Sequence, residues 1–390
     1  MINIDKDYII GLRREIHEYP EVGFDLPKTI GVVKRELDKM GILYTEEYGK
    51  SSVVATINPE KKDFTIGIRA DMDALLIEEK TDLPFKSKIK GQMHACGHDA
   101  HTAMLLGTAK ALKEMEDKIN CRVKLLFQPS EEGLESGAEK MVADGVMDEI
   151  DVIIGLHIEN WLDSGKIGVC KGESMASSRS FRIDFYGKTA HATLPNSGID
   201  ALACAIRTYD GIQSMLCIEI NPFSKYVCSV GKLSGGTSQN VVADHAFMLG
   251  TIRTFDMELD SFLIRRIEEI AKHYAQDVGG RAEVTTSLKA QVIYNNPHIS
   301  DLVINSAEKA VGIKNIAQMP IKLSSEDFSH YLTKKPGVFF RLGTRNEEKG
   351  CVTLPHNNDF LIDEEAFVNG SKTCVQFVLD NMDGIDEVTK

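Results

Sequence analysis

The chain has 390 residues and a formal net charge of −13, with 43% hydrophobic and 26% charged residues. This length predicts two domains or one large α/β domain, and the composition is typical of a soluble globular protein. The acidic charge argues against a nucleic-acid-binding protein, which needs clustered lysine and arginine, and the absence of an apolar run of about 18 residues argues against a membrane span.

The N-terminal stretch, residues 1–21, mixes charged and apolar residues and lacks the three regions of a signal peptide. Eight cysteines are scattered along the chain without a CxxC pair. This pattern is typical of reduced thiols, most of which we expect to pack as small core residues. We therefore expect a cytoplasmic protein.

The first half of the chain alternates helical and strand-like patterns. Helices are predicted over 5–19, 27–41 and 100–113, and strands over 51–57, 64–70 and 151–160 and at the start of 121–133. The alternation predicts a mainly parallel sheet flanked by helices, with ligands bound beyond the carboxyl ends of its strands. Polar residues follow or close these strands: Asp71, Asp73, Glu131, Glu132 and His157.

The middle of the chain has a different order of elements. Strands are predicted over 178–187, 225–234, 244–254 and 281–288, and helices over 198–217 and 257–278. This βαββαβ order is the ferredoxin-like arrangement, in which two helices cover one face of an antiparallel sheet. We therefore expect a lid domain, 178–288, inserted into a catalytic domain formed by 1–177 and 289–390. The clearest strand of the last segment is "PGVFFRLG".

Residues 94–101 read "HACGHDAH" and raise the question of a metal site. In an extended loop, Cys96 and His98 would point to the same side and could hold one ion. A structural zinc site would need a second pair of ligands at knuckle spacing, and none follows. A nucleophilic Cys96 with a histidine base remains an alternative, as does a histidine-rich loop without function.

Three distant segments favour a metal-dependent hydrolase. Glu131 and Glu132 are adjacent in a loop after an apolar strand, so one could bind metal while the other acts as a base. His157 closes an apolar strand, and His356 lies in "LPHNNDF". With Cys96 as a bridging thiolate, these residues suit two metal ions roughly 3.5–4 Å apart.

The motifs of the chain resemble those of the aminoacylase and carboxypeptidase family of dinuclear metallopeptidases. The resemblance rests on "RADMDALLIEE", "GQMHACGHDAHTAML", "QPSEEG", "GLH", "GKTAHATLP", "GGTSQNVVAD", "GTIRTFD" and "SSEDFSHYL", in the same order from Leu12 to Phe377. The amidohydrolase branch, with N-acyl-amino-acid amidohydrolases, hippurate hydrolases and plant auxin-conjugate hydrolases, is the most similar.

The resemblance implies a ligand set for each of two ions. Cys96, Glu132 and His356 would hold one ion, and Cys96, His98 and His157 the other. Cys96 would take the bridging place that an aspartate holds in the other branches of the family.

The resemblance also implies roles outside the ligand set. Glu131 would be the catalytic base, and Asp73 would orient the site. In the lid, His191 and Asn240 would reach an active site, often that of a partner subunit, and Arg253 would grip the substrate carboxylate. Taken alone, His191 could be an ordinary surface histidine and Arg253 an outward-facing strand residue. His94 and His101 are predicted to be hydrogen-bond partners of ligands rather than ligands.

Two positions depart from the family's pattern. Leu76 stands where proline is usual, and Ser324 stands where glycine is usual. Neither is a proposed ligand, so the departures concern loop shape and the substrate pocket.

The sequence thus predicts a metal-dependent amidohydrolase acting on N-acyl-L-amino acids or short peptides. The resemblance favours two divalent ions per subunit, Mn²⁺ first, with Zn²⁺, Co²⁺ or Ni²⁺ as alternatives, and a homodimer or homotetramer through the lid. A water bridging the ions, with Glu131 as base, would attack the amide. A dipeptidase or carboxypeptidase, an N-acetyldiaminopimelate deacetylase and a non-catalytic metal-binding protein are the alternatives. We expect no nucleic-acid or membrane partner.

Overall fold

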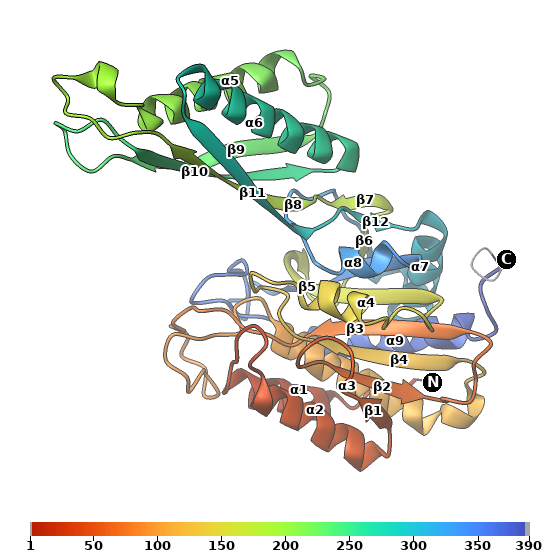
Figure 1. The fold of residues 1–390 in the computed structure, drawn as a ribbon. Coiled ribbons are helices and arrows are strands. Elements are labelled where there is room, and N and C mark those ends of the chain that lie inside the picture. The colour runs from red at the N-terminus through yellow and green to blue at the C-terminus, as the bar shows by residue number, and fades with distance from the viewer. Residues whose placement is uncertain (1, 387–390) are drawn as a thin grey trace. The chain divides into compact units, whose positions relative to one another are not determined.

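The computed structural model describes residues 2–386, which form two compact units (Figure 1). The first unit consists of the chain up to Ser174, Ile293–Ile321 and the chain from Asp327 onward. The second consists of Met175–Val292 and Lys322–Glu326. The short segment 322–326 differs from the predicted division, because its backbone pairs with the start of the second unit: the N–H of Ala176 donates to the carbonyl of Lys322 at 3.0 Å.

The first unit is built on an eight-stranded mixed sheet with flanking helices. In spatial order its strands are β1 (Leu43–Thr45), β2 (Val53–Ile57), β4 (Arg122–Gln128), β3 (Thr65–Asp71), β5 (Val152–Asp163), β14 (Gly337–Arg345), β6 (Ile167–Val169) and β13 (Ile316–Gln318). The four central strands β4, β3, β5 and β14 are parallel. Every residue of β3 and β4 is buried, as expected for parallel strands covered on both faces.

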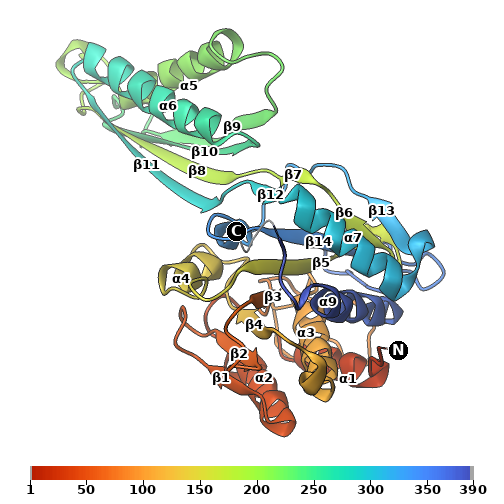
Figure 2. The same cartoon turned by 90° about the vertical axis from the view of Figure 1, so that its right-hand side faces the viewer.

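Seven α-helices accompany this sheet in the described part of the first unit: α1 (Lys6–His17), α2 (Pro27–Met40), α3 (His98–Glu114), α4 (Gly137–Ala143), α7 (Pro297–Val311), α8 (Ser329–Leu332) and α9 (Phe367–Asn381). Short 3₁₀ turns lie at Glu116–Lys118, Ile313–Asn315 and Glu364–Ala366, and β7 (Gly172–Met175) pairs with β12 (Ile293–Asn295). Helices α3 and α9 lie next to each other in Figure 2 and share one apolar core with β5 and β14, for example through Leu105, Phe377, Leu156 and Phe340. This core fixes α3, and therefore the histidines at its start, against the sheet.

The second unit has the predicted βαββαβ order. It consists of β8 (Ser178–Tyr186), α5 (Ala201–Ile218), β9 (Tyr226–Gly235), β10 (His245–Thr254), α6 (Met257–Asp277) and β11 (Arg281–Ala290), with a 3₁₀ turn at Pro195–Ser197. The antiparallel sheet has the order β11-β8-β10-β9. Alternate residues of β8, such as Phe181, Ile183 and Phe185, are buried in the core with α5 and α6. The aspartates Asp200 and Asp256 cap the two helices.

The described residues also bear on membrane spans and on the state of the cysteines. Within residues 2–386, no helix is both long enough and apolar enough to cross a membrane. All eight cysteines are unpaired in this part of the chain, and five are buried: Cys96, Cys121, Cys204, Cys351 and Cys374.

Candidate metal centre and active site

The "HACGHDAH" stretch turns into α3 rather than running as an extended loop. Gly97 adopts φ 83° and precedes the first residue of the helix, His98. A side chain at Gly97 would also collide with Ile158, since a Cβ would lie 2.1 Å from its Cδ1. The expected extended geometry of Cys96 and His98 is therefore wrong, although the tight turn still presents both side chains to one place.

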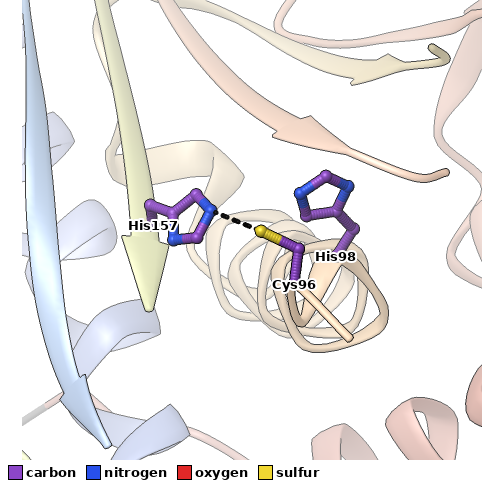
Figure 3. A group of neighbouring side chains, drawn as sticks. All are labelled: Cys96, His98 and His157. Atoms are coloured by element: carbon purple, nitrogen blue, oxygen red, sulfur yellow. Dashed lines mark hydrogen bonds between the residues drawn. The ribbon is translucent and has the colours of Figure 1, made fainter. Parts of the chain in front are cut away.

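Cys96, His98 and His157 come from three different elements and converge (Figure 3). One candidate ligand atom from each lies within 4.8 Å of the other two. The Sγ of Cys96 is 3.4 Å from Nε2 of His157. Nδ1 of His157 donates to the carbonyl of Ile158 at 2.6 Å, so Nε2 carries the lone pair that faces the sulfur.

Cys96, Glu132 and His356 form a second group with the same spacing limit of 4.8 Å. Nε2 of His356 lies 2.9 Å from a carboxylate oxygen of Glu132. His356 has φ 66°, an uncommon conformation for a non-glycine residue, and its N–H donates to the carbonyl of Ala95 at 2.8 Å. That bond ties the loop carrying His356 to the loop carrying Cys96. Because Cys96 belongs to both groups, its thiol is shared between two potential ligand sets.

Asp73 holds the surroundings of these ligands together. Its carboxylate is buried and accepts the backbone N–H groups of Glu131 and Glu132, both at 3.0 Å. It also accepts from Nδ1 of His98 at 3.3 Å. Nε2 of His98 is buried without a hydrogen-bond partner in the described part of the chain. A buried ring nitrogen without a partner fits a metal ion, as does the set of thiol, imidazole and carboxylate groups.

Glu131 lies at the same point as the ligands. Its carboxylate belongs with His98 and Glu132 to a third group within 4.8 Å, and its side chain is largely buried. The loop turns sharply between the strand and the glutamates, with Ser130 at φ 52° and its hydroxyl bonded to the carbonyl of Glu135 at 2.7 Å. Both carboxylates therefore lie at one centre, where one could bind metal and the other could act as a base.

Burial and neighbouring charges shape the electrostatics of the centre. Burial raises the pKa of Cys96 well above its usual value, and the charge of Glu132 adds to this. Burial acts to lower the pKa of His98, but Asp71 and Cys96 outweigh it and the pKa lies well above its usual value. The carboxylates of Asp71 and Glu132 thus favour positive charge at this point, and a divalent ion would supply it.

The prediction that His157 closes a strand is wrong. Strand β5 continues past it to Asp163, because β14 keeps pairing with β5 as far as Arg345. Gly155 and His157 pair with Phe339 and Arg341, so the histidine projects from within the sheet.

The environment of His94 and His101 agrees only in part with their predicted roles. His101 hydrogen-bonds to Asp71 and to the backbone of Ile158. The two ring nitrogens of His94 have no hydrogen-bond partner among residues 2–386. The prediction that His94 is a hydrogen-bond partner of a ligand is therefore wrong. Burial lowers the pKa of His94 to about 3, which keeps this imidazole neutral.

A buried polar network, to which the sequence motifs assign no role, lies next to the centre. Arg69 pairs with Asp71 at 2.6 Å and with Asp327 at 2.9 Å, and all three side chains are inaccessible to solvent. Asp327 also accepts from Ser136 Oγ at 2.7 Å and from the N–H of Ala138 at 3.2 Å. An arginine within the apolar pattern of β3 was the available signal, because a buried guanidinium requires carboxylate partners.

The three predicted lid residues lie in the second unit. His191 is exposed and bonds to the hydroxyl of Thr193 at 2.8 Å. The N–H of Ala192 donates to the carbonyl of Asn240 at 3.0 Å, which joins the two loops that carry His191 and Asn240. Nη1 of Arg253 donates to Ser325 at 2.8 Å, and burial lowers the pKa of its guanidinium. Their part in catalysis stays a prediction.

The departures at Leu76 and Ser324 leave the ligand groups intact. The side chain of Leu76 is 74% exposed, and it follows the bridge that pairs Leu75 with Met93. Ser324 uses its backbone carbonyl to accept from the N–H of Ala176 at 3.1 Å.

A parallel sheet that gathers thiol, imidazole and carboxylate side chains near the carboxyl ends of its strands is typical of metal-dependent hydrolases. The model of peptidase family M20/M25/M40 matches residues 67–380, and the chain belongs to this family. It is therefore a metal-dependent hydrolase of amide or peptide bonds, which excludes the non-catalytic alternative.

Similar proteins agree with this assignment. Thermostable carboxypeptidase 1 of Saccharolobus solfataricus is 37% identical, with 94% of this chain and 93% of that protein covered. N-acetyl-L-cysteine deacetylase of Bacillus subtilis is 38% identical, with 93% and 85% covered. Among solved structures, the YXEP protein of Bacillus subtilis, a dinuclear metal-binding peptidase of the M20 family, is 32% identical with a TM-score of 0.81, covering 97% of this chain and 99% of that one.

Proposed function

We propose that this protein is an amidohydrolase that cleaves N-acyl-L-amino acids into a carboxylate and a free amino acid. The observation that carries the proposal is the contact of Asp73 with the backbone of both Glu131 and Glu132. It fixes the backbone from which both carboxylates project: that of Glu132 belongs to a candidate ligand group with Cys96 and His356, and that of Glu131 to one with His98 and Glu132. The deacetylase of Bacillus subtilis supports the choice of substrate class.

The five proposed ligands are Cys96, His98, Glu132, His157 and His356. Two divalent ions held by them would supply Lewis acidity to the amide carbonyl and to the attacking water. Glu131 would take a proton from the water as its oxygen bonds to the carbonyl carbon. It would then deliver that proton to the nitrogen as the carbon–nitrogen bond breaks.

The lid residues would complete the substrate site. We propose that His191 donates a hydrogen bond to the carbonyl oxygen as negative charge develops there, and that Arg253 binds the substrate carboxylate. Asn240 would bind the substrate beside His191, since their loops are joined by the bond from Ala192 to Asn240.

A substrate panel tests the proposal. The purified enzyme would be assayed with N-acetyl and N-benzoyl amino acids, N-acetyldiaminopimelate, dipeptides and longer peptides, each with Mn²⁺, Zn²⁺, Co²⁺ or Ni²⁺. We expect the highest kcat/KM for an N-acyl amino acid. A kcat/KM that is at least tenfold higher for peptides with free amino termini would overturn the substrate assignment.

A carboxypeptidase or dipeptidase is the second candidate, because a relative of 37% identity is named a carboxypeptidase. The same base and ligands would serve that reaction. Blocking the amino terminus of a dipeptide distinguishes the two activities: an amidohydrolase for acyl groups tolerates the block, whereas a dipeptidase that recognises the free amine does not.

We propose Mn²⁺ as the native ion on the strength of the sequence resemblance. The thiol and imidazoles suit Zn²⁺ equally well, so affinity alone does not choose between them. Metal analysis of enzyme purified without added metal, followed by reconstitution with each ion, tests the proposal. We also propose a cytoplasmic location, in keeping with eight unpaired cysteines.

A further inference from the structure

The backbone of Ile158 joins two histidines of the centre. Its N–H donates to Nε2 of His101 at 3.0 Å, and its carbonyl accepts from Nδ1 of His157 at 2.6 Å. The rings of His101 and His157 are also in edge contact, with centroids 4.6 Å apart. The position and the tautomer of His157 are therefore connected to His101 through one residue.

The tautomer of His101 follows from these contacts. A backbone N–H can only donate, so Nε2 of His101 is the acceptor and the ring proton is on Nδ1. That nitrogen donates to one carboxylate oxygen of Asp71 at 2.5 Å. The other oxygen of Asp71 accepts from Arg69 at 2.6 Å, and the hydroxyl of Thr102 bonds to the carbonyl of Asp71 at 2.9 Å.

We propose that Asp71 and His101 are positioning residues: they present His157 to the metal with Nε2 as the ligand atom. The inference rests on the proposed metal site and adds two residues to it. Asp71 fixes the ring proton of His101, and His101 then holds the backbone N–H of Ile158, the residue whose carbonyl sets the tautomer of His157. Arg69 keeps Asp71 in place from the opposite side.

A metal ion held by Asp71, His98 and His101 is the competing explanation, because their ligand atoms lie within 4.8 Å of one another. The hydrogen bonds argue against it. The lone pair of His101 Nε2 is used by Ile158, and the guanidinium of Arg69 contacts Asp71 at 2.6 Å, where it would repel a cation. Asp71 and His101 are therefore supports of the centre.

The substitution Asp71→Asn tests the proposal with little change in shape. An aspartate accepts from both His101 and Arg69, whereas an asparagine has one acceptor oxygen, so one of the two bonds must fail. We expect the affinity for Co²⁺ to fall about 10–100-fold at one of the two sites, measured by competition with a chelator. The matched control is Asp260→Asn, since Asp260 is also buried and paired with an arginine, Arg179, but lies in the second unit. Its Co²⁺ affinity should equal that of the wild type.

Two substitutions of His101 separate its two bonds. In His101→Gln the side-chain oxygen can still accept from Ile158, whereas in His101→Asn the shorter side chain can reach only toward Asp71. We expect His101→Gln to bind Co²⁺ more tightly than His101→Asn, even if both unfold at the same lowered temperature. A purely structural role would lower stability without this order. This pair also provides the test if Asp71→Asn does not fold.

Nitrogen-15 spectra of the histidines give a second readout on the metal-free protein. We expect His101 to carry its proton on Nδ1 in the wild type, and His157 to lose its single tautomer in His101→Asn. Wild-type Co²⁺ affinity in all three variants at positions 71 and 101, with an unchanged His157 tautomer, would overturn the proposal. Because neither readout is turnover, failure of the substrate panel would leave this test intact, and failure here would leave the proposed function standing.

Discussion

A carboxylate oxygen of Asp73 lies 3.0 Å from the backbone nitrogen of Glu131, although 57 residues separate them in the chain. Asp73 follows the end of β3, and Glu131 follows the end of the neighbouring parallel strand β4. Parallel pairing brings both loops to one edge of the sheet. The contact means that the backbone of the proposed base is anchored to the loop after β3.

The tandem glutamates should separate by function. We expect Glu131→Gln to retain its metal and to lose turnover by roughly 10²–10⁴-fold, because an amide cannot accept the proton of the attacking water. Glu132→Gln should instead lose metal, because it removes a charged ligand that lies beside Cys96 and His356. Metal content by mass spectrometry and kcat on the best substrate of the panel measure the two effects. Equal metal loss in both variants would contradict the division of roles.

Cys96 should be needed for both ions, since it belongs to both candidate ligand groups. We expect Cys96→Ala to lower the metal content from two ions toward none and to abolish activity with it. The matched control is Cys374→Ala, a buried cysteine in α9 outside every candidate ligand group of the described chain. It should keep its metal. Full metal content in Cys96→Ala would rule out a bridging thiol.

Asp73→Asn should loosen the base without removing a ligand. Oδ1 of Asp73 accepts from the N–H of Glu131 and from Nδ1 of His98, and Oδ2 accepts from the N–H of Glu132, so in either orientation the NH₂ group of an asparagine would face at least one of these donors. We expect a loss in kcat that exceeds the change in KM, together with weaker metal binding through His98. A Michaelis constant that rises while kcat stays constant would instead indicate that Asp73 acts on substrate binding.

The candidate ligands could be picked out from sequence because their residue types are unusual where they occur. Cys96, Glu132 and His157 each follow or interrupt an apolar pattern, and the parallel topology brings such positions together. The local geometry was not predictable. The turn at Gly97 depends on the approach of Ile158, and the length of β5 depends on pairing with β14, which lies more than 170 residues further along the chain.

The residues proposed to support the centre were harder to predict from sequence than the candidate ligands. A pattern shows that Arg69 sits in a buried strand, but only the folded chain shows that its partners are Asp71 and the distant Asp327. The same holds for segment 322–326, whose backbone pairing with the second unit leaves no signature in composition. Contacts between segments far apart in sequence decide these features.

Removing the buried cation tests how much the network under the centre contributes to stability. Arg69→Met leaves Asp71 and Asp327 buried without their guanidinium, and breaking a buried pair in this way costs about 3–5 kcal/mol. We expect a lower midpoint of urea unfolding. Lys34→Ala, which breaks the exposed pair of Lys34 with Glu46, should leave the midpoint unchanged. Equal midpoints for Arg69→Met and the wild type would show that the network is dispensable for folding.

The lid is the remaining part of the proposed enzyme, and one of the two edge strands of its sheet suggests how it forms a dimer. Strand β9 pairs only with β10 in the described chain, and most of its residues are exposed. Exposed edges favour pairing with another chain, and a second copy would give a symmetric dimer, or a tetramer built from dimers. We propose that in this dimer His191 acts in the active site of the partner subunit.

Mixing two inactive variants tests that arrangement. His191→Ala and Glu131→Gln would be combined under conditions of proven subunit exchange. If His191 acts across the dimer, one site of each hybrid has both an intact base and an intact histidine, so activity should return to at most about half of that of the wild type per hybrid dimer. No recovery would place His191 in the site of its own subunit or outside catalysis. A fully active monomer in sedimentation equilibrium would remove the cross-subunit proposal, because no partner would then be present to supply the histidine.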